Sequence, residues 1–196
     1  MRSVVISGAM IALAVLTGCS GWNTFDKGPV VVDYHVGTTE LSGYPKMTEG
    51  TSDSFYEQAG SQRRDTFGPY NVRQCNTQRT ACSLGLVTLN SELKILSVGD
   101  ATTKLQITVD YKVSPEWRRD VAGGVFTAKL PNSEIIHGQG TVSRTAEITY
   151  GEVRHVELPY GLSYTLCASA PGVTTKSTRH CANQLNVKDP SSVPAI

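Results

Sequence analysis

The 196-residue sequence is poor in aromatic and in charged side chains. Aromatic residues make up 7% of the chain, with only two tryptophans, and charged residues make up 18%. It also lacks a His-Glu-x-x-His zinc motif, a Gly-x-Ser-x-Gly nucleophile elbow and a phosphate-binding glycine loop. The local signatures of metalloproteases, serine hydrolases and nucleotide-dependent enzymes are therefore missing, and we expect neither an enzyme nor a cofactor.

The N-terminus has the layout of a secretory signal peptide. A basic start with Arg2 precedes an uncharged run, Val4 to Leu16, which is too short to cross a bilayer comfortably as a helix. The stretch Leu16-Thr17-Gly18-Cys19 resembles the lipobox of bacterial lipoproteins. This resemblance implies diacylation of the Cys19 thiol, cleavage after Gly18 and acylation of the new amino terminus. Two or three acyl chains, at about 0.8 kcal/mol per buried methylene, hold a protein stably on a membrane.

The alternative is an ordinary signal peptide in which Cys19 occurs by chance. Ser20 follows the cysteine. In the lipoprotein family an Asp at this position commonly retains the protein at the inner membrane, so the resemblance favours the bacterial outer membrane, with the protein facing the periplasm or the cell surface.

The net charge argues against nucleic acid or an anionic lipid surface as a binding partner. Removal of the signal peptide, residues 1–18, leaves 178 residues with 17 basic and 17 acidic side chains. A formally neutral chain has no basic patch for nucleic acid or for anionic lipid. We therefore expect no nucleic-acid partner and expect membrane attachment to depend on the acyl chains of Cys19.

The cysteine count indicates disulfides. Assigning Cys19 to the lipid leaves an even number, and an exported chain of this kind usually pairs its cysteines. The remaining four are Cys75, Cys82, Cys167 and Cys181. They allow three connectivities, and we favour Cys75–Cys82 with Cys167–Cys181 because each bond closes a short loop. A zinc site that includes His180 is the alternative, but neither spacing is that of a structural zinc site, so we expect no metal.

Residues 19–83 have no regular pattern, and we expect a tether and an irregular segment that packs partly on a downstream domain. Gly-Pro and Gly-Tyr-Pro steps interrupt this segment. The run Val30 to Val32 predicts a short edge strand. Residues 52–60 predict a two-turn helix, because Ser54 and Glu57 have the spacing of a capping box and Gly60 follows.

Residues 84–190 predict an all-β domain, followed by a disordered tail over residues 191–196. Between Lys104 and Val113 apolar and polar residues alternate without a fault, which is the pattern of a half-buried strand. Further strands are expected over 86–89, 93–98, 125–130, 134–137, 145–150, 153–158, 164–169 and 179–187. Short strands separated by Gly, Pro, Asn and Ser favour a sandwich of two antiparallel sheets.

One corner of this domain resembles immunoglobulin-like and fibronectin type III domains. Leu158-Pro159-Tyr160-Gly161 is similar to the turn between their fifth and sixth strands, which precedes a Tyr-x-hydrophobic strand. The resemblance implies an immunoglobulin-like sandwich in which the Tyr164 hydroxyl bonds back to the backbone just upstream. Alternation places Cys167 on the opposite face from Tyr164, so the Cys167–Cys181 bond is expected on the outer face of its sheet.

Two loops are the candidate recognition elements. The first, residues 114–120, contains Trp117, Arg118 and Arg119, and Trp and Arg are enriched at binding hot spots. The alternative is that Trp117 covers the end of the core. The second loop, residues 170–178, contains Val173 and Lys176 and is closed by the expected Cys167–Cys181 bond. This bond pre-organises the loop and so lowers the entropy that the loop loses on binding. With immunoglobulin-like strand order, both loops project from the same end.

These features predict an outer-membrane lipoprotein that acts as a binding or structural accessory subunit of an envelope assembly, such as a pilus, secretion or conjugation apparatus. The alternative is an inhibitor or immunity protein that blocks a periplasmic hydrolase with its stapled loop. A third possibility, an enzyme acting on peptidoglycan or glycans, has no motif to support it. The four histidines are expected to be strand-surface residues and not general bases. They are His35, His137, His155 and His180.

Overall fold

The computed structural model describes residues 27–38, 50–78, 80–122, 124–130, 135–174, 176, 181–185 and 192–196. Over these residues the chain is all β, as the sequence predicts, and no helix is long and apolar enough to cross a membrane. The strands are β1 (Val30–Thr38), β2 (Gly50–Glu57), β3 (Gln62–Cys75), β4 (Cys82–Val98), β5 (Thr102–Ser114), β6 (Glu116–Val121), β7 (Gly124–Lys129), β8 (Gly138–Thr149), β9 (Val153–Leu158) and β10 (Leu162–Ser169). Two 3₁₀ turns are η2 (Pro159–Gly161) and η3 (Cys181–Gln184).

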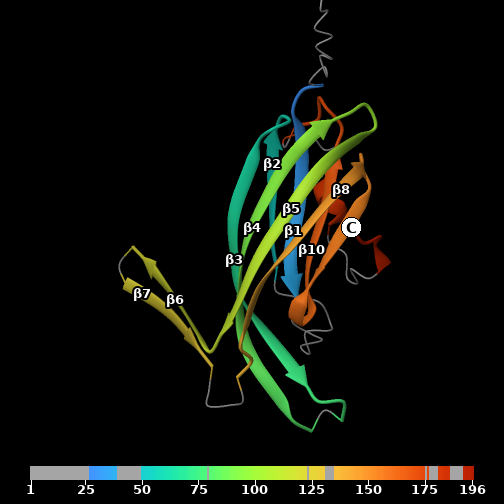
Figure 1. Ribbon diagram of the computed structural model, residues 1–196. Helices are drawn as coiled ribbons and strands as arrows, with labels where there is room; N and C mark the ends of the chain where they lie inside the picture. The colour runs from blue at the N-terminus through green and yellow to red at the C-terminus, as the bar shows by residue number, and fades with distance from the viewer. Residues whose placement is uncertain are drawn as a thin grey trace, which may run out of the picture.

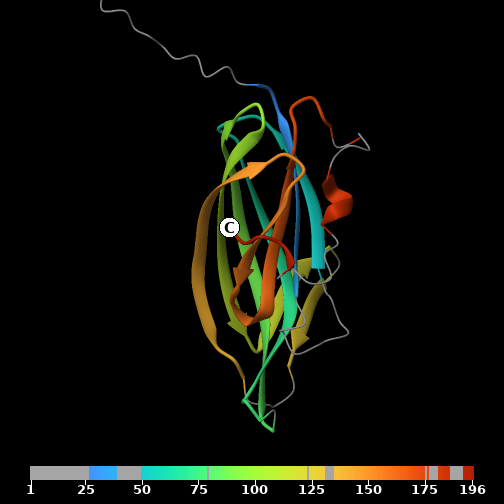
Figure 2. The same cartoon turned by 90° about the vertical axis from the view of Figure 1, so that its right-hand side faces the viewer.

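Two four-stranded antiparallel sheets pack face to face (Figures 1 and 2). The strand orders are β2-β1-β10-β9 and β3-β4-β5-β8, and β6 pairs only with β7 in a separate hairpin. Apolar side chains from both sheets form one core between the layers. At its centre the ring of Tyr34 stacks on Tyr164 with centroids 5.5 Å apart, and the Phe67 ring meets both edge-on.

The alternating stretch forms the long central strand β5, which confirms the prediction. Leu105, Ile107 and Val109 are buried in the core, whereas Lys104 and Asp110 on the opposite face are exposed. The predictions for 86–89 and 93–98 join into one strand, β4, which runs through both stretches. Strands β8, β9 and β10 contain the stretches 145–149, 153–158 and 164–169. A period of two is therefore a reliable signal for β5, because this strand has one face in the core and one face toward solvent.

The edge strand predicted at Val30 to Val32 is wrong. This run opens β1, which lies between β2 and β10 and is buried along most of its length. Val30 and Val32 pack in the core, and Val31 is buried on the outer face. An unbroken apolar run is typical of a strand that is covered on both faces, which is the physical reason that alternation is missing.

The helix predicted over residues 52–60 is also wrong, because residues 50–57 form strand β2 at the edge of its sheet. The spacing of Ser54 and Glu57 does not mark a helix cap. The Ser54 hydroxyl instead donates a hydrogen bond to Asp33 Oδ1 on the neighbouring strand. Pairing with β1 therefore overrides a local signal of this kind.

The irregular segment expected over residues 19–83 contains three strands of the sandwich, β1, β2 and β3. Strand β3 passes through the Gly68-Pro69 step with a register shift between Phe67 and Tyr70, and both aromatic residues are buried in the core. The boundary expected at residue 84 lies inside β4, which pairs with β3 from residue 82 onward. Each sheet thus combines strands from both sides of that boundary.

The C-terminal predictions need two corrections. The tail expected to be disordered is ordered over residues 192–196, where Ile196 packs against the core and its amide donates to the His155 carbonyl at 2.9 Å. The strand expected over 179–187 is replaced at Cys181–Gln184 by η3, and its remaining residues, except Leu185, lie outside the described part. In the stretch 134–137, the described residues form only an isolated bridge between Ile135 and Leu84.

The tyrosine corner that carries the immunoglobulin resemblance is absent. Strands β9 and β10 form a hairpin within one sheet, joined by η2, so Pro159 to Gly161 is a tight turn in which Tyr160 has φ of 63°. The Tyr164 hydroxyl is buried, and among the described residues it makes no hydrogen bond to the backbone upstream. Burial in the core raises its pKa above the ordinary value. Tyr164 is therefore a core residue and does not brace a corner.

Both favoured disulfides are present. Cys75 and Cys82 join β3 to β4, with their Cα atoms 3.9 Å apart. Cys167 of β10 is bonded to Cys181 of η3, with their Cα atoms 6.2 Å apart. Cys167 lies on the outer face, opposite Tyr164, as alternation predicts, and it forms a small buried cluster with Cys181 and Leu185.

Candidate recognition surfaces

The β6–β7 hairpin, residues 116–129, projects from the sandwich as an arm (Figure 1). It forms a sheet of its own, and β6 packs mainly on β7. Its base is closed by the Leu130 amide, which donates to the Pro115 carbonyl at 2.9 Å. An isolated two-stranded hairpin is marginally stable in water, so a surface that covers the arm would stabilise it.

The arm holds the first set of predicted recognition residues. Trp117, Arg118 and Arg119 lie in strand β6 and not in a loop as expected, with Trp117 opposite Ala128 in the register. Trp117 is half-buried, and it is not among the described residues that form the sandwich core. Arg118 is exposed, and on the neighbouring strand the side chain of Val125 is 49% exposed.

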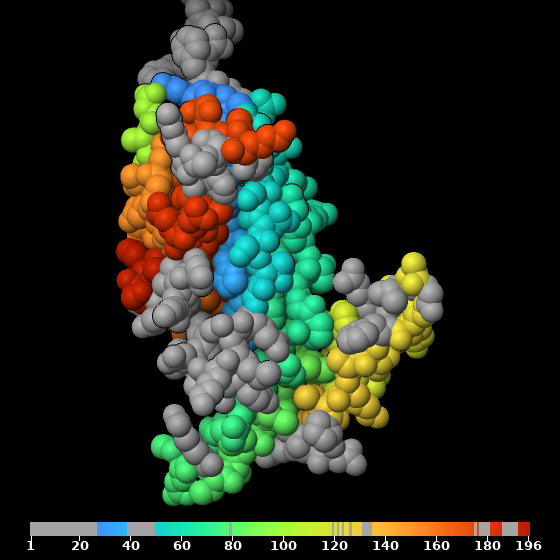
Figure 3. Space-filling model, turned by 180° about the vertical axis from the view of Figure 1, so that it is seen from behind, coloured from blue at the N-terminus to red at the C-terminus, as the bar shows by residue number. Residues whose placement is uncertain are grey.

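A second hairpin projects beside the arm. It is the tip of β3 and β4, residues 73–84, closed by the Cys75–Cys82 disulfide. Behind the bond, Asn76 organises the turn, because its Oδ1 accepts the Thr80 amide at 2.9 Å and its Nδ2 donates to the Thr80 hydroxyl at 2.9 Å. The tip is thus a disulfide-closed hairpin, and most of its described residues are exposed. Figure 3 shows tip and arm as separate lobes, green and yellow, at one end of the molecule.

The two ends of the sandwich differ. At the entry end, where β1 begins, Val31 lies opposite Ser169, the last residue of β10, and the Gly151 amide donates to the Ala168 carbonyl. At the other end, here called the hairpin end, β5 finishes at Ser114; the tip extends beyond this end, and the arm leaves it and points to the side (Figure 1). The described chain therefore enters at one end and presents its two projecting hairpins at the opposite end.

The second predicted loop lies at the entry end. Residues 170–174 follow β10 there, with Val173 half-buried and its amide bonded to the Ala170 carbonyl at 3.2 Å. Lys176 is exposed, and residues 175 and 177–178 lie outside the described part. The expectation that this loop and Trp117 share one end is therefore wrong. The error comes from the assumed immunoglobulin-like strand order, which the β9–β10 hairpin does not follow.

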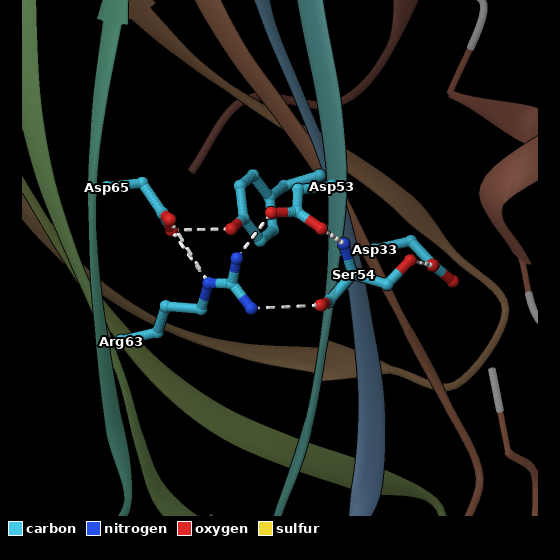
Figure 4. A network of polar contacts seen from close by, with 6 residues as sticks. Asp33, Asp53, Ser54, Arg63 and Asp65 are labelled. Carbon is cyan, nitrogen blue, oxygen red and sulfur yellow. Dashed lines mark hydrogen bonds and ion pairs between the residues drawn. The ribbon is translucent and has the colours of Figure 1, made fainter. Parts of the chain in front are cut away.

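A polar network joins the two sheets where the chain crosses from β2 to β3 (Figure 4). Arg63 of β3 is its centre: Nη2 pairs with Asp53 of β2, and Nε donates to both carboxylate oxygens of Asp65 at 3.0 and 3.1 Å. Asp65 also accepts the Tyr34 hydroxyl at 2.6 Å. Burial, followed by this hydrogen bond, raises the pKa of Tyr34. Because its members satisfy one another, the network is a structural clamp.

The outer face of the β3-β4-β5-β8 sheet carries polar side chains in cross-strand rows. In one row the Thr66 hydroxyl donates to Asn90 Oδ1 at 2.9 Å, and the Thr141 hydroxyl donates to Asp110 Oδ1 at 2.5 Å. Asn90 and Asp110 lie directly opposite each other in the register. Two hollows of about 450 and 270 Å³ indent this face, and both are lined by Asn90 and Asp110.

Three of the four histidines, His35, His137 and His155, lie in the described part of the chain. Nδ1 of His35 lies 2.9 Å from the Ser52 hydroxyl, but no carboxylate hydrogen bond orients the imidazole among the residues that the structure describes. Burial lowers the pKa of His35 below its ordinary value. His155 is buried and is not the surface residue expected, and its backbone pairs with residues 194–196; His137 is exposed and His180 lies outside the described residues.

Within the described ranges, no group of three or more His, Cys, Asp or Glu side chains could hold a metal ion. The chain matches no family model, no curated protein and no solved structure. The case for a function therefore comes from the sequence motifs and the geometry of the surfaces. The sequence missed β6 and the polar rows on the outer face. The alternation of Lys104 to Val113 was the available signal for that face, because it places every second residue there.

Proposed function

We propose that this chain is an outer-membrane lipoprotein that binds an envelope protein through its hairpin end and serves as an accessory subunit of an envelope assembly, such as a pilus, secretion or conjugation apparatus. The observation that carries the proposal is that the two ends of the sandwich differ. The tip and the arm project from the end opposite to the one where β1 begins. A lipid anchor on Cys19, upstream of β1, puts the membrane on the entry side.

The dimensions are those of a short spacer. Strand β4 has 17 residues and, at about 3.3 Å per residue, spans roughly 55 Å from the hairpin end to the entry end. The chain between Cys19 and Val30 adds at most about 38 Å when fully extended. An anchored sandwich therefore holds the arm well away from the bilayer, where it reaches a partner in the envelope.

The chemistry of the arm supports protein contact. Trp117 and Arg118 are residue types enriched at binding hot spots, and Val125 adds an exposed apolar side chain. Because the hairpin packs on little besides itself, a partner surface that covers it contributes burial that the isolated chain lacks. Arg118 Nε lies 3.9 Å from Asp120 Oδ1 on the same strand, and both side chains are largely exposed. Exposed polar residues of this kind are typical of the rim of a protein–protein interface.

Membrane fractionation of cells that express the full chain tests the anchor. We expect the wild-type protein in the outer-membrane fraction and Cys19→Ser released from membranes, because the thiol that carries two acyl chains is gone. Ser20→Asp is the matched variant, since it keeps Cys19 and is expected to move the protein to the inner membrane. Retention of Cys19→Ser in the outer membrane would contradict the anchor.

A further inference from the structure

The outer face of the β3-β4-β5-β8 sheet contains a trough that crosses the strands. The larger hollow, about 450 Å³, extends from Arg64 on β3, and the smaller, about 270 Å³, extends to Gln139 on β8. Asn90 of β4 and Asp110 of β5 line both hollows, so the two hollows adjoin, and we call them together the trough. Four strands spaced about 4.8 Å apart give the trough a length of about 14 Å.

The side chains at the centre of the trough are fixed by neighbours and keep one unused polar group each. Thr66 donates to Asn90 Oδ1, which orients the amide and leaves its Nδ2 group as a donor. Thr141 donates to Asp110 Oδ1, which leaves the second carboxylate oxygen as an acceptor. Because Asn90 and Asp110 are directly opposite each other, their Cβ atoms lie about 5 Å apart, and a donor and an acceptor occupy neighbouring strands.

A hydroxyl group both donates and accepts, so neighbouring hydroxyls of a sugar ring complement an adjacent amide and carboxylate. The charge of the lining favours a neutral ligand. Arg64 is paired with Glu92 at 2.7 Å, and Asp110 shares the smaller hollow with Lys112. The trough thus has no surplus cation to hold a phosphate and no apolar wall to hold an acyl chain.

We propose that this trough binds a neutral oligosaccharide, with Asn90 as hydrogen-bond donor and Asp110 as acceptor. The site goes beyond the proposed function, because it lies on the face of the sheet and uses neither the arm nor the tip. The ring of Tyr111 packs edge-on against Tyr160, with centroids 6.1 Å apart, and does not serve as a stacking platform. Hydrogen bonds in an open trough then dominate, so the affinity is expected in the millimolar range.

Titration of the ¹⁵N-labelled full chain with chitotetraose and with cellotetraose, followed by NMR, tests the site. We expect saturable shifts of the amides around Asn90 and Asp110 with at least one of the two sugars. Asn90→Ala and Asp110→Asn are each expected to weaken binding about tenfold, since each removes one oriented hydrogen bond. Gln62→Ala is the matched control, because Gln62 is exposed on the same face but outside the trough; its affinity should equal that of the wild type.

The same spectra show whether each variant is folded, so a loss of binding is separable from a loss of structure. Binding of a neutral sugar should change little between low and high salt. The proposal is overturned by the absence of saturable binding to both sugars, by equal affinities of wild type and both trough variants, or by binding confined to a sulfated oligosaccharide with steep salt dependence.

Discussion

Arg63 ties the two sheets together at the point where the chain passes from one to the other. Its guanidinium contacts Asp53 of β2 and Asp65 of β3, and Asp65 in turn holds the hydroxyl of the core residue Tyr34. The side chain is 34% exposed, so water screens this network less than it screens a surface ion pair. Removal of the guanidinium leaves two carboxylates beside each other and a tyrosine in contact with one of them.

We predict that Arg63→Ala lowers the free energy of unfolding by about 1–3 kcal/mol, as expected when hydrogen-bonded charges lose their partner. Arg64→Ala is the matched control, because its side chain is 72% exposed and forms a surface ion pair with Glu92. Its cost should stay below about 1 kcal/mol. Urea denaturation of both variants measures the difference, and equal costs would contradict the role of Arg63 as a clamp.

Individual residues were predictable where a single physical cause acts on them. The strict alternation from Lys104 to Val113 reports one core face, and it predicted β5. The capping-box spacing of Ser54 and Glu57 was misleading, because Ser54 bonds instead to Asp33, a residue distant in sequence. Partners of this kind, such as Asp53 for Arg63, depend on which strands become neighbours and have no local signature.

At the scale of elements, the two disulfides have different surroundings. Cys167–Cys181 attaches η3 to the outer face of β10, where both cysteines and Leu185 are buried. Cys75–Cys82 closes the projecting tip of β3 and β4, outside the core cluster. The sequence predicted both bonds from short spacing, but it did not show that one joins a buried cluster and the other a protruding hairpin.

We predict that replacing Cys167 and Cys181 by Ser lowers the free energy of unfolding by about 3 kcal/mol, the chain-entropy value for a loop of about 15 residues. The matched replacement of Cys75 and Cys82 should act mainly locally. A projecting hairpin opens without unfolding the core, so amide hydrogen exchange should quicken in the tip and remain unchanged in β5. The opposite pattern, with exchange raised throughout by the Cys75 and Cys82 replacement, would contradict this assignment.

The projecting elements were the hardest to predict. Residues 114–120 have no alternating pattern strong enough to identify β6, because the arm has no core to impose one. Strand β1 was misread for the opposite reason, since burial on both faces removes alternation. Sequence reasoning therefore predicted the half-buried strand β5 and, within the arm, the stretch 125–130 of β7, but it placed β1 at an edge and missed β6.

At the scale of the whole molecule, function depends on which end faces which partner. The entry end carries the start of β1 and residues 170–174, and the hairpin end carries the tip and the arm. No local motif contains this information, because it follows from strand order. The immunoglobulin resemblance placed the two candidate loops together, and the hairpin of β9 and β10 separates them.

Site-specific photo-cross-linking in native membranes tests the central claim most directly. A photoreactive residue at Val125 probes the arm, and the same residue at Lys176 probes the entry end; both positions are exposed. The account predicts one reproducible envelope-protein adduct from position 125 and none from position 176. No adduct from position 125, or equal adducts from both positions, would contradict recognition through the hairpin end.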